Sequence, residues 1–241
     1  MGWLYACAVG WMSSRPCVCV SPAACCTATP LSLLILTPPK RLRPQPQDAY
    51  GLEKLATEEL CKHYNKDFGI ECRIARFHNI YGPHGTWKGG REKAPAAFCR
   101  KVLTSTSEIE MWGDGKQTRS FTFIDDCVEG ILRITKSDFR DPLNLGSTEM
   151  VSMNGMMELA MSFDDKKLPI KHIPGPEGVR GRNSDNKLIL EKLGWEPTVT
   201  LADGLKWVWA WACFLKGLRL RLVGNGGCAG DGVLRPTGSA A

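Results

Sequence analysis

The sequence predicts an α/β layered domain between residues 48 and 211. Three observations lead to this prediction. Apolar residues recur at helical spacing in some segments and alternate with polar residues in others. The two kinds of segment follow one another along the chain, and turn or cap residues stand between them. Such an alternation is typical of domains in which helices cover a sheet.

The first predicted element is a helix at residues 50–66, because Leu52, Leu55 and Leu60 fall on one face at helical spacing. Residues 70–77 follow as a strand. The rest of the domain is expected to contain, in order, a helix at 93–105, a strand at 108–112, a strand leading into a helix within 120–137, a strand at 142–147, a helix at 152–163, a strand at 168–175, a helix within 184–197 and a last amphipathic helix at 201–215.

Cap and breaker residues set the ends of these helices. Pro95 is tolerated because the first turn of a helix leaves its N–H groups unpaired. Asp125 or Asp126 is the expected N-cap of the third helix, and Ser152 that of the fourth. Gly194 is the expected C-cap of the fifth helix.

The two ends of the chain differ from this domain. Residues 1–47 and 212–241 show no sustained helical or alternating period, and we expect a poorly ordered leader and tail. The leader holds four basic residues and no acidic one, and the tail four and one, so the net charge of +6 leaves residues 48–211 at −1. A near-neutral domain favours no nucleic-acid or membrane partner, and no run reaches the ~18 apolar residues of a membrane span.

The eleven cysteines are an odd number without regular spacing, which does not predict a disulfide framework. The early C-V-C and C-C pairs lack the spacing of a zinc site, and His78, His84 and His172 share no ligand spacing, so no metal site is predicted. The interior cysteines lie in apolar patterns and read as buried thiols of a cytoplasmic protein. They are Cys61, Cys72, Cys99 and Cys127.

Tyr50 and Lys54 are four residues apart at the start of the first predicted helix, so they share a face. A phenol has a pKa near ~10 and is a poor base at neutral pH, but a nearby ammonium stabilises its phenolate. Such a pair can take a proton from a sugar hydroxyl while hydride leaves the same carbon for a nicotinamide. A surface tyrosine beside a solvated lysine is the alternative interpretation.

Several further motifs accompany this pair: RFHNIYGP at 76–83, GDGKQTRSFTFIDD at 113–126, NLGS at 144–147 and LGWEP at 193–197. Together they resemble the catalytic and substrate-binding portion of the extended short-chain dehydrogenases, which include NAD-dependent nucleotide-sugar epimerases and dehydratases. The segments GTWKGGREKAPAAFCRK at 85–101 and PGPEGVRGRNSDN at 174–186 are more particular. They resemble the plant-type GDP-mannose 3,5-epimerase family, and the resemblance covers about residues 46–211.

This resemblance implies a partial NAD(P)-binding Rossmann-like fold without its first nucleotide-binding half. It implies conversion of GDP-mannose to GDP-L-galactose through a 4-keto intermediate, with NAD as cofactor. Tyr50 and Lys54 match the hydride-transfer pair and also contact the cofactor, and Lys93 matches an acid/base lysine. A lysine at a helix N-terminus opposes the macrodipole, which favours the functional interpretation of Lys93.

The resemblance also implies a GDP-sugar site, whose pyrophosphate would meet guanidinium and amide donors. The residues that match are Asn79, Glu92, Lys93, Ala94, Lys101, Gln117, Thr118, Arg119 and Arg182. Taken one by one, a solvated surface residue would be the simpler interpretation of each. Their order along the chain is what favours a site.

A dinucleotide site needs a glycine-rich turn after a first strand. None precedes Tyr50, and Gly224-x-Gly226 is followed by too few residues. The family's second acid/base, a cysteine upstream of the tyrosine, has no match. We therefore expect a truncated or aberrantly spliced product with foreign ends, inactive as an isolated chain, whose early strands lack their usual neighbours.

Two hypotheses follow for the function. The first is a GDP-mannose 3,5-epimerase, active alone or with a complementary chain. The second is a non-catalytic remnant that binds a GDP-sugar or an intact epimerase subunit. The tyrosine-bearing helix lies at the dimer interface in the family, so the resemblance allows a homodimer or pairing with an intact subunit.

Overall fold

The computed structural model describes residues 17–22, 49–164, 166–175 and 181–217. The helices are α1 (Ala49–Phe68), α2 (Ala94–Thr104), α3 (Ile124–Lys136), α4 (Met153–Ser162), α5 (Lys187–Leu193) and α6 (Leu201–Leu215). The strands are β1 (Cys17–Pro22), β2 (Cys72–Phe77), β3 (Ile80–Tyr81), β4 (Ile109–Trp112), β5 (Thr118–Ser120), β6 (Thr122–Phe123), β7 (Leu143–Leu145), β8 (Met150–Ser152), β9 (Ile170–Ile173) and β10 (Gly181–Arg182).

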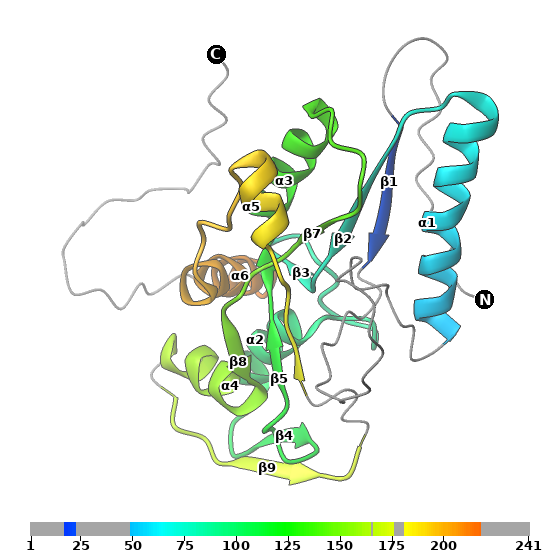
Figure 1. Cartoon of the computed structure of the whole chain (residues 1–241). Coiled ribbons are helices and arrows are strands. Elements are labelled where there is room, and N and C mark those ends of the chain that lie inside the picture. Colours follow the sequence, from blue (N-terminus) through cyan, green and yellow to red (C-terminus); the bar gives the residue numbers. More distant parts are fainter. Residues whose placement is uncertain (1–16, 23–48, 165, 176–180, 218–241) are drawn as a thin grey trace, which may run out of the picture.

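A parallel sheet in the order β1-β2-β7 forms one part of the molecule (Figure 1). Side chains of β2 point alternately to its two faces. Ala75 and Phe77 pack with Cys127 and Ile134 of α3, whereas Arg76 reaches α1. The two helices therefore cover opposite faces of this sheet.

The second part is built on smaller sheets. Strand β5 pairs with β10 in parallel and with β8 antiparallel, while β4 pairs with β9 and β3 with β6. Helices α2, α4 and α6 pack on one another and enclose the larger of two apolar cores. The smaller core lies between β2, β7, α3 and α5 and includes the buried Trp195.

Strand β1 was not predicted from the sequence. Its six residues pair with β2 along the whole strand, from Cys17 opposite Cys72 to Pro22 opposite Phe77. Because β7 occupies the other side of β2, both edges of β2 are paired. That the early strands lack their usual neighbours stays a prediction. An unpaired edge offers backbone N–H and C=O groups to any extended segment. The rest of the leader and the tail beyond Gly217 lie outside the described residues.

Two of the three predicted cap positions are confirmed. The Ser152 hydroxyl accepts a hydrogen bond from the N–H of Gly155 at 3.0 Å, and Gly194 ends α5 with φ of 59°. The prediction for α3 is wrong, because its N-cap is Phe123, which makes no side-chain cap bond. The Asp126 carboxylate instead accepts hydrogen bonds from residues distant in the sequence, the N–H groups of Thr198 and Val199.

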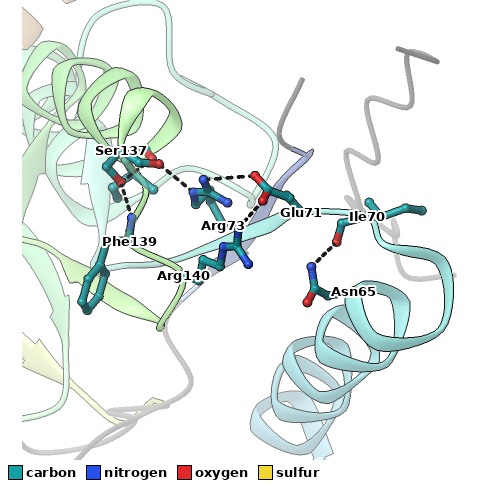
Figure 2. A network of polar contacts seen from close by, with 8 residues as sticks. Asn65, Ile70, Glu71, Arg73, Ser137, Phe139 and Arg140 are labelled. Carbon is teal, nitrogen blue, oxygen red and sulfur yellow. Dashed lines mark hydrogen bonds and ion pairs between the residues drawn. The ribbon is translucent and has the colours of Figure 1, made fainter. Parts of the chain in front are cut away.

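A polar network fastens the C-terminal end of α3 to the start of β2 (Figure 2). The guanidinium of Arg73 is almost completely buried and donates from Nε to the carbonyl of Ser137 at 2.9 Å. Glu71 forms ion pairs with Arg73 and with the exposed Arg140, as Figure 2 shows. The network sets where β2 begins, and so where its other end meets the candidate site.

Candidate functional site

The first candidate pair lies at the start of α1. Tyr50 is the second residue of this helix, and its side chain lies outside what the structure describes. Lys54 follows one turn later, with its side chain only 13% exposed and Nζ 2.9 Å from Oε1 of the exposed Glu53. The helix thus places both residues on one face at the expected spacing, while the contact between their side chains stays a prediction.

A buried ion pair holds this helix against the sheet. Glu58, which is 1% exposed, lies one turn beyond Lys54 on α1. Its two carboxylate oxygens accept hydrogen bonds from Nε and Nη2 of Arg76 on β2, at 2.7 and 2.6 Å. A fork of this kind fixes both distance and orientation between its two elements. The position of Lys54 relative to β2 follows from it.

Asn79, Arg119 and Arg182 gather around β5. Asn79 follows β2 with an unusual positive φ of 25°, and its side-chain amide donates to the carbonyl of Ser120 at 2.9 Å. Strand β10 pairs in register with β5, so that the Cα atoms of Arg182 and Arg119 are partners. Paired residues of adjacent strands point to the same face, about 4.8 Å apart. The side chain of Arg182 itself lies outside what the structure describes.

Glu92, Lys93 and Ala94 form the entry to α2. Lys93 is its N-cap, with an extended backbone and an exposed side chain that makes no cap bond. The Glu92 carboxylate accepts a hydrogen bond from Nη2 of Arg100 at 2.6 Å. Its own N–H group, and then the Arg100 guanidinium and the N–H of Gly90, hold the pKa of Glu92 below its usual value. Ala94 is the first helical residue and packs against the larger core.

Lys101 lies two turns into α2 and points at β4. Its Nζ donates to the carbonyl of Glu110 at 2.6 Å. Partial burial lowers the pKa of Lys101, and the neighbouring charge of Arg100 lowers it further. The ammonium is therefore held in a fixed place beside a strand rather than extended into solvent.

Gln117 and Thr118 lead into β5. The Gln117 carbonyl accepts the N–H of Met153 at 3.2 Å, and its side-chain Oε1 is buried without a hydrogen-bond partner among the described residues. The Thr118 carbonyl accepts a hydrogen bond from Nη1 of Arg119 at 2.8 Å. Buried polar atoms are nearly always paired in folded proteins, so Oε1 of Gln117 is an exception within the described residues.

The candidate residues thus fall into three groups. Asn79, Gln117, Thr118, Arg119 and Arg182 lie on or beside β5. Glu92, Lys93, Ala94 and Lys101 lie at α2, which Lys101 joins to β4, the strand that precedes β5 through one turn. Tyr50 and Lys54 lie on α1, which packs on β1 and β2. The link between the first and third groups is β2, which runs directly into His78 and Asn79.

His78 is buried, and a Cβ added at Gly146 would lie 2.9 Å from the Cβ of His78, so the two backbones pack closely.

No group of three metal-ligating side chains occurs in the part of the chain that the structure describes. Within those same residues, no helix is long and apolar enough to cross a bilayer. Trp209 is buried, whereas Trp207 on the same helix is half exposed.

Comparison with known proteins agrees with the motifs that the fold brings together. Residues 33–146 match the model of the NAD dependent epimerase/dehydratase family. GDP-mannose 3,5-epimerase 1 of Oryza sativa subsp. indica is 77% identical over 167 residues, and GDP-mannose 3,5-epimerase of Arabidopsis thaliana is 78% identical over the same length. The chain is a homologue of the GDP-mannose 3,5-epimerases. These matches take in 69% of this chain but 44% of each relative, so the chain spans less than half their length.

Solved structures of related epimerases have the same fold. UDP-glucuronic acid 4-epimerase from Bacillus cereus, in complex with UDP-glucuronic acid and NAD, is 25% identical with a TM-score of 0.69, over 82% of this chain and 61% of that one. UDP-glucose 4-epimerase from Thermotoga maritima, with UDP-glucose, is 27% identical with a TM-score of 0.69, over 84% and 64%. The predicted α/β fold of the extended short-chain dehydrogenase type is confirmed.

Sequence reasoning missed three charged residues that hold this site. Glu58 and Arg76 are 18 residues apart and meet only after α1 packs on β2. The signal for Glu58 was its place four residues after Lys54, on the face already assigned to the catalytic pair. Arg100, the partner of Glu92, directly precedes a residue that was singled out, and no local pattern distinguishes it.

Proposed function

We propose that residues 48–211 are the catalytic and substrate-binding portion of a GDP-mannose 3,5-epimerase and bind a GDP-sugar. The reaction is the conversion of GDP-mannose to GDP-L-galactose through a 4-keto intermediate. The single observation that supports this most is the register of β5 and β10, with Arg119 and Arg182 as partners. Partner residues of adjacent strands share a face of the sheet, and two arginines so placed would suit a pyrophosphate, which offers charged oxygens on both of its phosphorus atoms.

The surroundings of this pair support the same assignment. Asn79 is held beside Arg119 through its bond to Ser120, and Gln117 keeps a buried carbonyl oxygen for a donor on the ligand. Lys101 supplies a further cation from α2. The three elements that carry these groups are far apart in the sequence, so only the folded domain can offer them to one ligand.

Lys93 and the α1 pair have the chemistry that epimerisation needs. A ketone at C4 of the sugar acidifies the protons at C3 and C5, and a base must remove and return them. The exposed ammonium of Lys93, at a helix N-terminus that disfavours a cation, is the acid/base that we assign. Tyr50, with Lys54 one turn away, is assigned the proton of the C4 hydroxyl.

The residues described here fit NAD only in part. NAD would accept hydride from C4, and Lys54 on α1 is the residue that we assign to its ribose. The pyrophosphate of a dinucleotide needs a glycine-rich turn that opens a helix. Helices α2 to α6 follow Lys93, Phe123, Ser152, Asn186 and Thr200 instead, and residues 23–48, which directly precede α1, lie outside the described ones.

Calorimetry with GDP tests the proposal without requiring turnover. Removal of one buried charge-assisted contact costs about 1.5–3 kcal/mol, which is roughly ten- to a hundredfold in affinity. Arg182→Ala should weaken GDP binding by that factor, whereas Lys40→Ala, in the leader, should leave it unchanged. Equal affinities in the wild type and both variants would contradict the assignment of the site.

The alternative function is a non-catalytic one, binding to an intact epimerase subunit or to a second copy. An apolar stripe on α1 favours it: Leu52, Leu60, Tyr64 and Phe68 are exposed at four-residue multiples along one face. Phe68→Glu should then shift the chain toward smaller species in size-exclusion chromatography, with Phe214→Glu on α6 as the matched control. A monomeric wild type, with an intact subunit present or not, would exclude this alternative. A cytoplasmic location stays part of the proposal.

A further inference from the structure

The loop before α2 has no close packing neighbours at Gly89 and Gly90. Gly89 and Gly90 have φ of 99° and 77°, and a Cβ on either would meet no heavy atom within 4 Å. Residues other than glycine rarely adopt such positive φ angles, so this turn requires glycine at both positions. Trp87 anchors the earlier part of the loop in the larger core, but the two glycines make no packing contact that would fix where the residues after them lie.

The ion pair between Glu92 and Arg100 supplies that contact. The two residues are eight positions apart, about twice the three or four of a pair along one helix face. Glu92 precedes α2 and Arg100 lies within it, so the bond ties the end of the loop to the helix. The carboxylate is held at 2.6 Å with its side chain only 9% exposed.

This pair is not arranged for stability alone. Oε2 of Glu92 and Nε of Arg100 are buried and have no hydrogen-bond partner among the described residues. A two-bond fork, as between Glu58 and Arg76, would have used both atoms. The side chain of Arg100 is 28% exposed, and an ion pair that is partly open to solvent contributes little to the stability of a fold. The geometry thus serves the placement of the loop more than the free energy of folding.

Arg100 also stands next to both lysines of the proposed site. Lys93 directly follows Glu92, so the tether fixes its backbone while leaving its side chain exposed. Lys101 directly follows Arg100, and the charge of Arg100 acts on its ammonium. The Arg100 guanidinium therefore binds Glu92, the residue before Lys93, and Arg100 is also the direct sequence neighbour of Lys101.

We propose that Arg100 is a positioning residue of the GDP-sugar site, which acts through Glu92 to hold Lys93 where the sugar ring binds. This inference rests on the proposed function, because it takes Lys93 to face the sugar. It goes beyond that function in assigning a role to a residue that need not touch the ligand. The sugar end of the ligand depends on the tether, whereas the pyrophosphate is held by groups on β5 and β10.

Calorimetric titration of the full chain with GDP and with GDP-mannose tests this separation. We expect Arg100→Met to weaken GDP-mannose binding by roughly tenfold, the equivalent of about 1.4 kcal/mol, and GDP binding much less. Arg100→Lys keeps a cation within reach of Glu92 and should restore most of the preference for GDP-mannose. Lys192→Met removes the lysine of an exposed ion pair with Glu191 on α5, away from the residues assigned to the site, and should change neither affinity. Circular dichroism melts establish that each variant is folded.

The outcomes separate the two levels of the proposal. A wild type that binds neither nucleotide overturns the proposed function and this inference together. A wild type that binds GDP but does not prefer GDP-mannose overturns this inference alone, as does an Arg100→Met variant that keeps the full preference. If Arg100→Met weakens both ligands equally and Arg100→Lys does not restore the ratio, Arg100 stabilises the fold without positioning Lys93, and the inference is wrong.

Discussion

Glu58 of α1 and Arg76 of β2 form a two-bond ion pair in which both side chains are largely buried. Glu58 lies four residues after Lys54 and eight after Tyr50, on one face of the helix. The pair therefore fixes both the height and the rotation of α1 against the sheet. Because the same helix carries the proposed catalytic pair, its stability and its function depend on one contact.

Removal of one partner of this pair should be costly. Arg76→Met leaves the Glu58 carboxylate buried and uncompensated, and we predict a loss of about 3–5 kcal/mol in the free energy of unfolding. Urea denaturation followed by circular dichroism measures it. Lys62→Met, which breaks the exposed pair with Glu59, is the control and should cost about 1 kcal/mol or less. The double change Glu58→Leu and Arg76→Met should recover much of the loss, and equal costs in Arg76→Met and Lys62→Met would contradict the account.

Gly204 allows α6 to lie directly on Tyr81. A Cβ at this position would come within 2.1 Å of the Tyr81 hydroxyl oxygen and 2.8 Å of the ring of Phe123. Replacing a helical glycine by alanine normally stabilises a helix by up to about 1 kcal/mol. Here we predict the opposite sign, a loss of about 1–3 kcal/mol from overpacking. A Gly204→Ala variant whose melting temperature rises would show that the contact between α6 and Tyr81 is looser than described.

Acid should weaken the tether of the α2 loop. The pKa of Glu92 lies below its ordinary value, so the unfolded chain binds the proton more readily than the folded one. The ionised carboxylate thus contributes stability that is fully present above the ordinary pKa and is lost as the pH falls through the lowered one. Unfolding free energies of the wild type and Glu92→Gln, measured from about pH 7 to about pH 3.5, should differ at neutral pH and converge in acid. A difference that persists or grows on acidification would contradict this assignment.

The isolated chain should not turn over GDP-mannose. Its sequence has no glycine-rich fingerprint ahead of Tyr50 and no match to the family's second acid/base residue. We therefore predict no GDP-L-galactose when the pure chain is incubated with GDP-mannose and NAD and the products are separated by chromatography. Turnover that Tyr50→Phe abolishes would prove this prediction wrong.

The long helices and the strands at 72–77 and 109–112 could be predicted because their apolar periodicity is a local property. The two- and three-residue strands β3, β5, β8 and β10 were not predicted, because a few residues become a strand only through distant partners, whereas β6 lies in the strand expected before the helix within 120–137. Strand β1 is the extreme case, since its partner is about fifty residues away. Asp126 has the chemistry of an N-cap, but tertiary donors from Thr198 and Val199 compete successfully for its carboxylate.

In the candidate site, too, some residues could be found from local sequence spacing, while the contacts between distant segments could not. Tyr50 and Lys54 could be singled out from spacing alone, and Arg119 and Arg182 only through resemblance to a family. That these two arginines are register partners is a consequence of strand pairing, which no single-sequence pattern shows. Arg76 and Arg100 escaped notice because the partner of each lies well outside the spacing of neighbouring helical residues.

A double-mutant cycle on Arg119 and Arg182 tests the central claim, a GDP-sugar site at β5 and β10, most directly. The affinity for GDP is measured by calorimetry for the wild type, Arg119→Ala, Arg182→Ala and the double variant. If both guanidinium groups bind one pyrophosphate, each single change should weaken binding roughly ten- to a hundredfold. The two effects should then be non-additive by at least about 0.5 kcal/mol, because the residues share a ligand group. A wild type that does not bind GDP, or variants that bind it as tightly as the wild type, would contradict the claim.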